Sequence, residues 1–312
     1  MEFFHKPTSF PFMATRKVWY GLSIVFMVGS IALFFTRGLN LDIDFTGGVT
    51  IPVTFPTAAN NDAVRAALVR AGYHDPQVQS FGSSREVSIR LPPLGLKQDA
   101  DGIRAQVTKV LQGVDPAVDV QAPSVVGPQV GGELQRSAEL ALFFTLVGIF
   151  IYIALRFHTW RLSLGAILAV IHDPILVVGI FALLQTPFDL PAVAAILAVI
   201  GYSLNDTVVV FDRIRERFGV NRRMASAQVL DQSINQTLSR TIMTKVVTAL
   251  VVLALLFLGG PALRGFSEAL MIGIIAGTYS SIYISSAIAL DCGLSSEHLF
   301  PTAKKSAIDA MP

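Results

Sequence analysis

The sequence is poor in charged residues and in cysteine. Only 15% of its 312 residues are Asp, Glu, Lys or Arg, whereas soluble domains average about 25%. The one cysteine, Cys292, excludes an intrachain disulfide and a cysteine-rich metal site. These shortages argue against an ordinary soluble domain and against a small disulfide-stabilised scaffold.

The motifs of two common classes of active site are also missing. The sequence has no phosphate loop of the form G-x-x-x-x-G-K-[ST] and no zinc motif H-E-x-x-H, and its five histidines are scattered. A net charge of +2 is too small to indicate binding to nucleic acid. We therefore expect the protein not to be an enzyme, to use no cofactor or metal, and to bind no nucleic acid.

Apolar residues, in contrast, are abundant: they make up 52% of the chain, and the mean hydropathy is +0.58. They gather in six runs close to the roughly 20 residues that cross a bilayer as a helix. The first run is longer than the apolar region of a signal peptide, so we expect it to remain as a span. The pattern predicts a polytopic α-helical membrane protein with spans at residues 18–36, 138–155, 162–184, 190–211, 242–258 and 266–290.

Basic residues gather in the short loops of one side. Five of them lie in the loop after the fourth span: Arg213, Arg215, Arg217, Arg222 and Arg223. Because Lys and Arg favour the cytoplasmic side, we expect residues 1–17, the connector 212–241 and the tail 291–312 to be cytoplasmic. The long segment 37–137 then lies on the outer side. Within the connector, residues 220–238 predict a separate amphipathic helix at the membrane surface.

The long outer segment has the pattern of a small soluble domain. Strands are predicted at residues 49–55, 78–81, 87–91 and 118–126, and helices at 61–71 and 99–111. The order β-α-β-β-α-β predicts an α+β domain of the ferredoxin-like type. Pro52 favours an edge position for the first strand. Both helices are expected on one face of the sheet, which leaves the other face free for a partner.

Asp206 lies inside the fourth span, about 24 Å along the helix from its start at 1.5 Å per residue. Ionisable groups within the membrane are costly and indicate function. A buried carboxylate can carry a proton; alternatively, Asp206 is permanently paired or reaches the headgroups. The small and polar residues that precede it are predicted to face the bundle with it: Ala198, Gly201, Tyr202 and Asn205.

Arg240 is predicted at the entrance of the fifth span, with Lys245 one turn further in. Spans four and five enter the membrane from the same side, so Asp206 and Arg240 can approach each other if the helices are neighbours. A nearby arginine stabilises the ionised carboxylate, and its withdrawal favours protonation. The alternative is an ordinary arginine that reaches the membrane interface.

His172 and Asp173 lie near the centre of the third span and are followed by Pro174. Proline removes one helical hydrogen bond and bends the helix. The pair is therefore either a proton relay or a local polar pair that stabilises a kink.

The sixth span carries small residues at every fourth position. Such a stripe lets helix backbones approach closely. It indicates tight packing within the bundle, or a sliding interface. Its members are Ala269, Gly273, Gly277, Ser281, Ser285 and Ala289.

The layout of one span, an external domain and five further spans is that of half a resistance-nodulation-division (RND) transporter. Local motifs narrow the resemblance. They are LDIDFTGG at 41–48, IHDPILVVG at 171–179, IGYSLNDTVVVFDRIRE at 200–216, SINQTLSRT at 233–241 and GGPALRGF at 259–266. Together they resemble the SecF family of accessory subunits of the bacterial Sec translocase.

This resemblance implies a function and partners. Members of the family pair with SecD in the bacterial inner membrane, associate with the SecYEG channel, and use the proton gradient to help export unfolded preproteins; YajC and YidC are further candidate partners. In the family, the Asp of the Asn-Asp-Thr motif and the Arg of the Ser-Arg-Thr motif are implicated in proton movement. They fall here on Asp206, flanked by Asn205 and Thr207, and on Arg240.

The same resemblance makes 41–48 the motif that leads from the first span into the periplasmic domain, with Asp42, Asp44, Gly47 and Gly48 as its polar and glycine positions. Two alternatives remain open from the residues. One is half of an RND-type exporter of small molecules or lipids, and the other is a structural subunit that stabilises a translocon without proton coupling.

Overall fold

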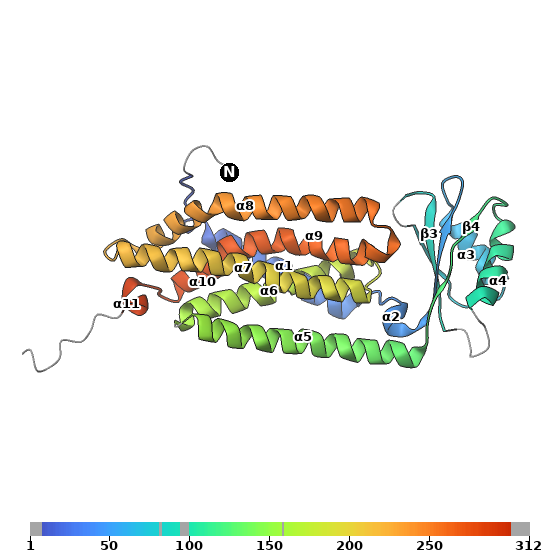
Figure 1. Ribbon diagram of the computed structural model, residues 1–312, viewed down its shortest axis with the longest axis horizontal. Coiled ribbons are helices and arrows are strands. Elements are labelled where there is room, and N and C mark those ends of the chain that lie inside the picture. Colours follow the sequence, from blue (N-terminus) through green and yellow to red (C-terminus); the bar gives the residue numbers. More distant parts are fainter. Residues whose placement is uncertain (1–7, 81–82, 94–99, 158, 301–312) are drawn as a thin grey trace, which may run out of the picture.

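The computed structural model describes residues 8–80, 83–93, 100–157 and 159–300. Figure 1 shows an elongated molecule in which a bundle of long helices carries a small α+β domain at one end. Among the described residues, six segments are long and apolar enough to cross a membrane, as predicted. They are α1 (Arg16–Arg37), α5 (Pro128–Arg156), α6 (Trp160–Leu184), α7 (Leu190–Val220), α8 (Ser226–Leu258) and the segment Arg264–Asp291.

The last of these segments is not a uniform α-helix. It consists of α9 (Arg264–Tyr279), a π-helical turn η2 (Ser280–Ile284) and α10 (Ser285–Asp291). The short helices η1 (Pro261–Leu263) and α11 (Ser296–Leu299) flank it. A π-turn widens the backbone by one residue and often marks a functional position. The hydropathy pattern did not predict this change.

At the end of the bundle remote from the α+β domain, α7 and α8 extend beyond the apolar runs that predicted them. The prediction of a separate helix at residues 220–238 is wrong. Ser226–Leu258 form one continuous helix, α8, and only five residues separate α8 from α7. The sequence from 226 to 258 contains no Gly or Pro that would end a helix. Val229, Leu230 and Ile234 are buried in the bundle core, so these first turns belong to the bundle.

The small domain has the predicted ferredoxin-like topology. Its sheet order is β2-β3-β1-β4 with all pairs antiparallel, and β5 also pairs with β1. The predicted strand at 118–126 is split into two short strands, and predicted positions 81 and 99 lie outside the described residues. The elements are β1 (Gly48–Thr54), α3 (Asn61–Arg70), β2 (Gln77–Ser80), β3 (Glu86–Leu91), α4 (Ala100–Gln112), β4 (Asp119–Val120) and β5 (Ser124–Val126).

Pro52 does not place β1 at an edge, contrary to the prediction, because β1 pairs with β3 on one side and with β4 and β5 on the other. The proline is tolerated because it falls between the two short strands. β5 pairs with Gly48–Thr50, and β4 pairs with Val53 and Thr54. Pro52 therefore has no ladder bond to donate on that side, and its carbonyl still accepts a bond from Gln121 N at 2.9 Å.

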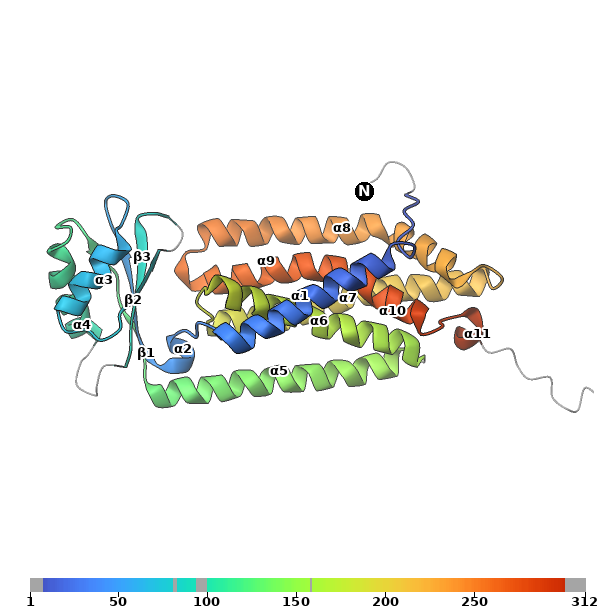
Figure 2. The ribbon, with the colours of Figure 1, turned by 180° about the vertical axis from the view of Figure 1, so that it is seen from behind.

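The two faces of the sheet have different neighbours. Val49, Ile51 and Val53 are buried in a core that α3 and α4 complete. The opposite face, which was expected to be free, looks toward the loops of the helical bundle (Figure 2). A cavity of about 580 Å³ lies there, lined by sheet residues such as Thr50 and Ser88 and by loop residues of the bundle. A partner of that face would have to enter this space.

The LDIDFTGG motif joins the domain to the bundle through α2 (Ile43–Thr46). Asp42 accepts a bond from Ile43 N at 2.8 Å and forms an ion pair with Arg90 at 3.3 Å. Asp44 accepts a bond from Leu190 N, the first residue of α7, at 2.9 Å. The motif therefore ties β1 of the domain to the start of α7.

The two glycines of this motif have positive φ angles, 71° at Gly47 and 132° at Gly48. A Cβ on Gly48 would lie 2.5 Å from the carbonyl oxygen of Leu91, and one on Gly47 would lie 2.8 Å from Cα of Pro128. Only glycine combines these angles with such close backbone contacts. Both positions are therefore required by the geometry of the junction.

Within the bundle, α7 and the segment Arg264–Asp291 are the most buried, and α1, α5 and α8 are the most exposed. Small residues permit the close packing at the centre. A Cβ on Gly273 would lie 2.1 Å from the side chain of Val199 on α7. Gly277 lies against Ser203 of α7, and Ser281 and Ser285 are buried one turn apart. The stripe of small residues thus faces the centre of the bundle.

Candidate functional site

A buried ion pair joins α7 to α8 in the middle of the bundle. The Nζ atom of Lys245 lies 2.7 Å from Oδ2 of Asp206, and both side chains are less than 10% exposed. Burying two charges is costly and is tolerated when they neutralise each other. The sequence singled out Asp206 but assigned its charge partner to Arg240, and gave Lys245 no role.

An aromatic ring completes the surroundings of the lysine. Nζ of Lys245 lies 4.2 Å from the ring centroid of Tyr202, one turn before Asp206 on α7. The hydroxyl of Tyr202 bonds to the carbonyl of Thr244 at 2.9 Å and to the hydroxyl of Thr248 at 2.8 Å. A cation over a ring face is attracted by the ring quadrupole. Tyr202 therefore fastens α7 to α8 and also stabilises the ammonium group.

The carboxylate of Asp206 has few other partners. Among the described residues, no hydroxyl or amide donates a hydrogen bond to it. Its charge is therefore balanced mainly by one ammonium group, and a change in the protonation of Asp206 removes the counter-charge of Lys245. This is the arrangement that a charge-dependent switch requires.

Arg240 does not contact Asp206 in this structure. It is exposed, it forms no ion pair with a described carboxylate, and it acts on Asp206 only through longer-range attraction. Five residues of an α-helix turn through about 140° relative to the axis, so Arg240 and Lys245 point from different sides of α8. The expected direct contact between Asp206 and Arg240 is replaced by the contact with Lys245.

The neighbours of Asp206 on α7 lie on two different faces. Thr207 is fully buried and donates to the carbonyl of Ser203 at 3.3 Å. Asn205, by contrast, is exposed, as are Ala198 and Gly201. The prediction that these three residues face the bundle is wrong for this chain. Consecutive residues differ by about 100° around a helix, so Asp206 turns toward α8 while Asn205 turns outward.

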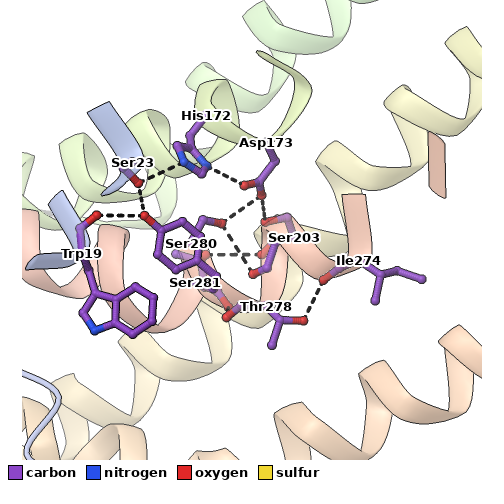
Figure 3. Close-up of polar contacts among 12 residues, drawn as sticks. Trp19, Ser23, His172, Asp173, Ser203, Ile274, Thr278, Ser280 and Ser281 are labelled. Atoms are coloured by element: carbon purple, nitrogen blue, oxygen red, sulfur yellow. Dashed lines mark hydrogen bonds and ion pairs between the residues drawn. The ribbon is translucent and has the colours of Figure 1, made fainter. Parts of the chain in front are cut away.

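The second polar cluster lies between α1, α6, α7 and the π-turn (Figure 3). Asp173 is fully buried and accepts bonds from the hydroxyls of Ser203 at 2.5 Å and Ser280 at 2.9 Å. Its other oxygen lies 3.0 Å from Nδ1 of the buried His172. Helix α6 runs from Trp160 to Leu184 with Pro174 inside it. The kink at Pro174 remains a prediction.

Sequence reasoning found the carboxylates of both clusters and missed most of their partners. Lys245 is a charged residue in an apolar run, which is a usable signal. Tyr202 and Ser203 carry no such signal, because a tyrosine or serine in a membrane helix is common. Their roles depend on which helices are neighbours and on how each is rotated.

The comparisons with known proteins agree with the motifs. A sequence model described as protein export membrane protein SecD/SecF, C-terminal, matches residues 106–295. The protein translocase subunit SecF of Haemophilus influenzae is 45% identical over 301 residues, covering 96% of this chain and 91% of that protein. SecF of Pseudomonas aeruginosa is 44% identical and covers 96% and 97%. The chain belongs to the SecF family.

Solved structures support the same assignment. The crystal structure of SecDF from Thermus thermophilus, a translocon-associated membrane protein, matches with a TM-score of 0.82 and 37% identity. It covers 91% of this chain and 39% of that chain, so the SecF-like part is less than half of the solved protein. A second SecDF structure, in a super-membrane-facing form, matches with a TM-score of 0.68 and 36% identity. A partnership with SecD is thereby implied.

Family membership decides between some of the alternatives. It identifies a protein translocase subunit of the Sec export system, which is a transport protein and not an enzyme. Half of an RND-type exporter of small molecules or lipids is therefore set aside. The choice between a proton-coupled subunit and a purely structural one is a separate question about Asp206 and its partners.

Proposed function

We propose that this chain, together with SecD, uses the proton gradient to promote the movement of unfolded preproteins across the bacterial inner membrane. The observation that carries the proposal is the buried ion pair between Asp206 and Lys245. Asp206 is the proton-carrying group, and Lys245 is its counter-charge. The coupling ion is the proton, and no other cofactor is required.

Protonation of Asp206 changes the forces between α7 and α8. The neutral carboxyl no longer balances the ammonium of Lys245, which then lies buried without a counter-ion, a costly state. Lys245 must move toward another partner or toward water, and the contact between the two helices changes with it. Release of the proton restores the pair. Arg240, exposed near the middle of α8 and five residues before Lys245, contributes positive charge on the path that such a proton would follow.

The helix that carries Asp206 is linked at its start to the outer domain. Helix α7 begins at Leu190, whose N–H is bonded to Asp44 of the LDIDFTGG motif. The residue before this start, Asp189, caps the helix by accepting a bond from Ala192 N at 2.7 Å. A shift of α7 along its axis would therefore pull on α2 and, through it, on β1.

The available energy sets the scale of the movement. One proton that crosses a potential of 100 mV supplies about 2.3 kcal/mol, and each unit of pH difference adds about 1.4 kcal/mol. Shifting a two-state arrangement from mostly one form to mostly the other requires about 5.5 kcal/mol. A few protons per stroke are therefore sufficient to change the population of two domain arrangements.

The two solved SecDF structures support a mobile arrangement. They match this chain with nearly equal identity and coverage, yet with TM-scores of 0.82 and 0.68. Because identity and coverage are nearly equal, sequence divergence does not account for the lower TM-score of the super-membrane-facing form. A domain that can adopt two positions relative to the bundle is what the proposed coupling requires.

We infer that SecD covers the exposed face of α7. Four residues spaced three or four apart lie on that face: Ala194, Ala198, Gly201 and Asn205. Small residues permit close helix contacts, and a polar side chain such as that of Asn205 is unfavourable against lipid. The other exposed surfaces of the membrane-spanning helices face the bilayer. The SecYEG channel is the expected neighbour of the complex. YajC and YidC remain predicted partners.

The proposed orientation follows from the basic residues. Arg16, Arg156, Arg161 and Arg213 lie at the ends of helices remote from the α+β domain, where Arg156 pairs with Asp212 at 2.5 Å. By the positive-inside rule that end is cytoplasmic. Both termini are then cytoplasmic, and the α+β domain is periplasmic.

The test replaces Asp206 by Asn in cells and measures export of a secreted reporter, together with the membrane levels of the chain and its co-purification with SecD. We expect export to fall to the level without the chain while assembly is normal. Asp212→Asn is the matched control, because Asp212 lies on the same helix in a partly exposed ion pair. Normal export by Asp206→Asn would favour the purely structural subunit.

A further inference from the structure

The second polar cluster extends from Asp173 to the backbone of α1 as an unbroken chain of hydrogen bonds. Nε2 of His172 lies 3.1 Å from the hydroxyl of Ser23. This hydroxyl also contacts the hydroxyl of Tyr279, and the Tyr279 hydroxyl donates to the carbonyl of Trp19 at 3.0 Å. This series of hydrogen bonds thus runs from the centre of the bundle toward the end of α1 that carries Arg16.

The directions of these bonds can be worked out from one fixed point. A backbone carbonyl only accepts, so the Tyr279 hydroxyl uses its one hydrogen on Trp19. The Ser23 hydroxyl must then donate to Tyr279, which leaves its oxygen to accept from Nε2 of His172. His172 therefore carries a hydrogen on Nε2.

The remaining ring nitrogen then fixes the proton content of the pair. If Nδ1 of His172 carries no hydrogen, Asp173 must be protonated to bond to it. If Nδ1 carries a hydrogen, the imidazole is a cation beside a carboxylate. In both cases His172 and Asp173 together hold the same number of protons and have no net charge, which is the favourable state for a pair that is almost fully buried.

We propose that His172 and Asp173 form a second protonatable site of the membrane bundle, and that the hydroxyls of Ser23 and Tyr279 carry its proton toward the end of α1. This deepens the proposed proton coupling and rests on it for its role, although the site itself can be tested alone.

The transfer step is balanced in protons. The hydrogen on Nε2 of His172 passes to the Ser23 oxygen, the Ser23 hydrogen passes to the Tyr279 oxygen, and the Tyr279 hydrogen leaves to a water molecule. Afterwards Tyr279 donates to Ser23, and Ser23 donates to the bare Nε2. Nδ1–H donates to the carboxylate of Asp173; in the form that begins with a protonated Asp173, the Asp173 proton has moved to Nδ1. The pair has then lost one proton and carries one negative charge.

The surroundings suit both protonation states. The hydroxyls of Ser203 and Ser280 donate to the Asp173 carboxylate and would stabilise its negative charge. Two charged groups on the adjoining helices are paired with other residues. Asp206 of α7 is paired with Lys245, and Arg16 of α1 is paired with Asp291. Tyr279 is the titratable group that the pair faces from α9, with its ring centroid 5.5 Å from that of His172.

The π-turn adjoins this cluster. It begins at Ser280, directly after Tyr279, and so rotates the two residues relative to the rest of the segment. Ser280 reaches Asp173 while Tyr279 reaches Ser23. A continuous α-helix would place the following residues, including the buried Ser281 and Ser285, in a different register.

The first experiment measures the site directly. The chain is labelled with ¹⁵N-histidine, reconstituted in liposomes with its SecD partner and studied by solid-state NMR, and the signal of His172 is assigned by its loss in His172→Gln. We expect Nε2 to carry a hydrogen at neutral pH, as the bond directions require. An Nε2 without hydrogen at neutral pH would overturn the bond directions and the proposal with them.

The second experiment tests the path. Proton entry into the same liposomes is followed with an enclosed pH-sensitive dye after an acid jump. We expect Tyr279→Phe, which removes only a hydroxyl, and Asp173→Asn to lower the flux at least tenfold. Ser286→Ala is the matched control, because it removes a buried hydroxyl of the same segment that has no partner among the described residues.

Asp206→Asn is measured in parallel so that the two ideas fail separately. Loss of flux in Asp206→Asn with normal flux in Tyr279→Phe and Asp173→Asn refutes the second site and leaves the proposed function standing. Normal flux in Asp206→Asn refutes the proposed function, whatever the other variants do. Should Asp173→Asn fail to assemble, Tyr279→Phe and Ser23→Ala decide the result.

Discussion

Replacing Lys245 with Met removes the one cation that contacts Asp206 among the described residues, while the length of the side chain is nearly kept. We expect this variant to be less stable than one that lacks both charges. The reason is that the loss of one member of a buried pair leaves an uncompensated charge, which costs about 3–5 kcal/mol. The double variant Asp206→Asn/Lys245→Met leaves no such charge.

The size of the effect has an upper limit that depends on pH. Asp206 can escape the cost by taking up a proton. For an ordinary aspartate with a reference pKa of about 3.9, this uptake costs about 4 kcal/mol at pH 7 and about 1.4 kcal/mol less for each unit of lower pH. The destabilisation by Lys245→Met should therefore be no more than about 4 kcal/mol at pH 7 and should shrink steadily toward pH 5.

The assay is reversible unfolding in mixed micelles by titration with SDS, applied to the wild type, both single variants and the double variant. The double-mutant cycle isolates the pairwise energy, for which we expect about 2–4 kcal/mol. Additive effects of the two single substitutions would refute the argument that the ion pair holds α7 to α8. A destabilisation by Lys245→Met that does not change with pH would refute the protonation of Asp206.

Two further predictions concern the junction between the bundle and the domain. Gly48→Ala should destabilise the protein by about 1–3 kcal/mol, because φ is 132° and the new Cβ would meet the Leu91 carbonyl; Gly127→Ala, which meets nothing within 4 Å, is the control in the same unfolding assay. Burial raises the pKa of Asp189 to about 6, with Asp42 and Asp44 adding to the effect. Between about pH 4 and 6 the folded protein therefore holds a proton on Asp189 that the unfolded chain has lost. The free energy of unfolding should fall as the pH rises through this range. Asp189→Asn should remove this fall in a pH series of melting temperatures, and an unchanged pH profile would contradict the assignment.

The spans and the domain could be predicted because each depends on a local pattern. Six apolar runs and one β-α-β-β-α-β alternation specify elements without reference to their neighbours. The ends were less predictable. Helix α7 continues to Val220 because Ile214 and Phe218 remain buried after the apolar run has ended. Hydropathy alone does not record such an amphipathic extension.

Only one member of the buried ion pair, Asp206, could be predicted from the sequence. Asp206 is conspicuous as an acid in an apolar helix, and its motif points to it. Its partner depends on how α8 is rotated against α7. Two cations lie five residues apart on α8, and the sequence pattern does not show which of them faces α7. The structure selects Lys245 and leaves Arg240 on the surface. The π-turn at Ser280 was equally beyond reach, because no residue type requires it.

The two buried carboxylates of this bundle differ in a way that assigns them different tasks. Asp173 is held by two hydroxyls and an imidazole, so a change in its protonation is absorbed by hydrogens that reorient within a fixed frame. Asp206 depends on one long, flexible lysine, so a change in its protonation leaves a buried ammonium that must move. A group with many short partners suits proton storage and transfer, whereas a group with one mobile partner suits the conversion of a proton into helix movement. Asp206 is therefore the position at which we expect proton binding to do mechanical work.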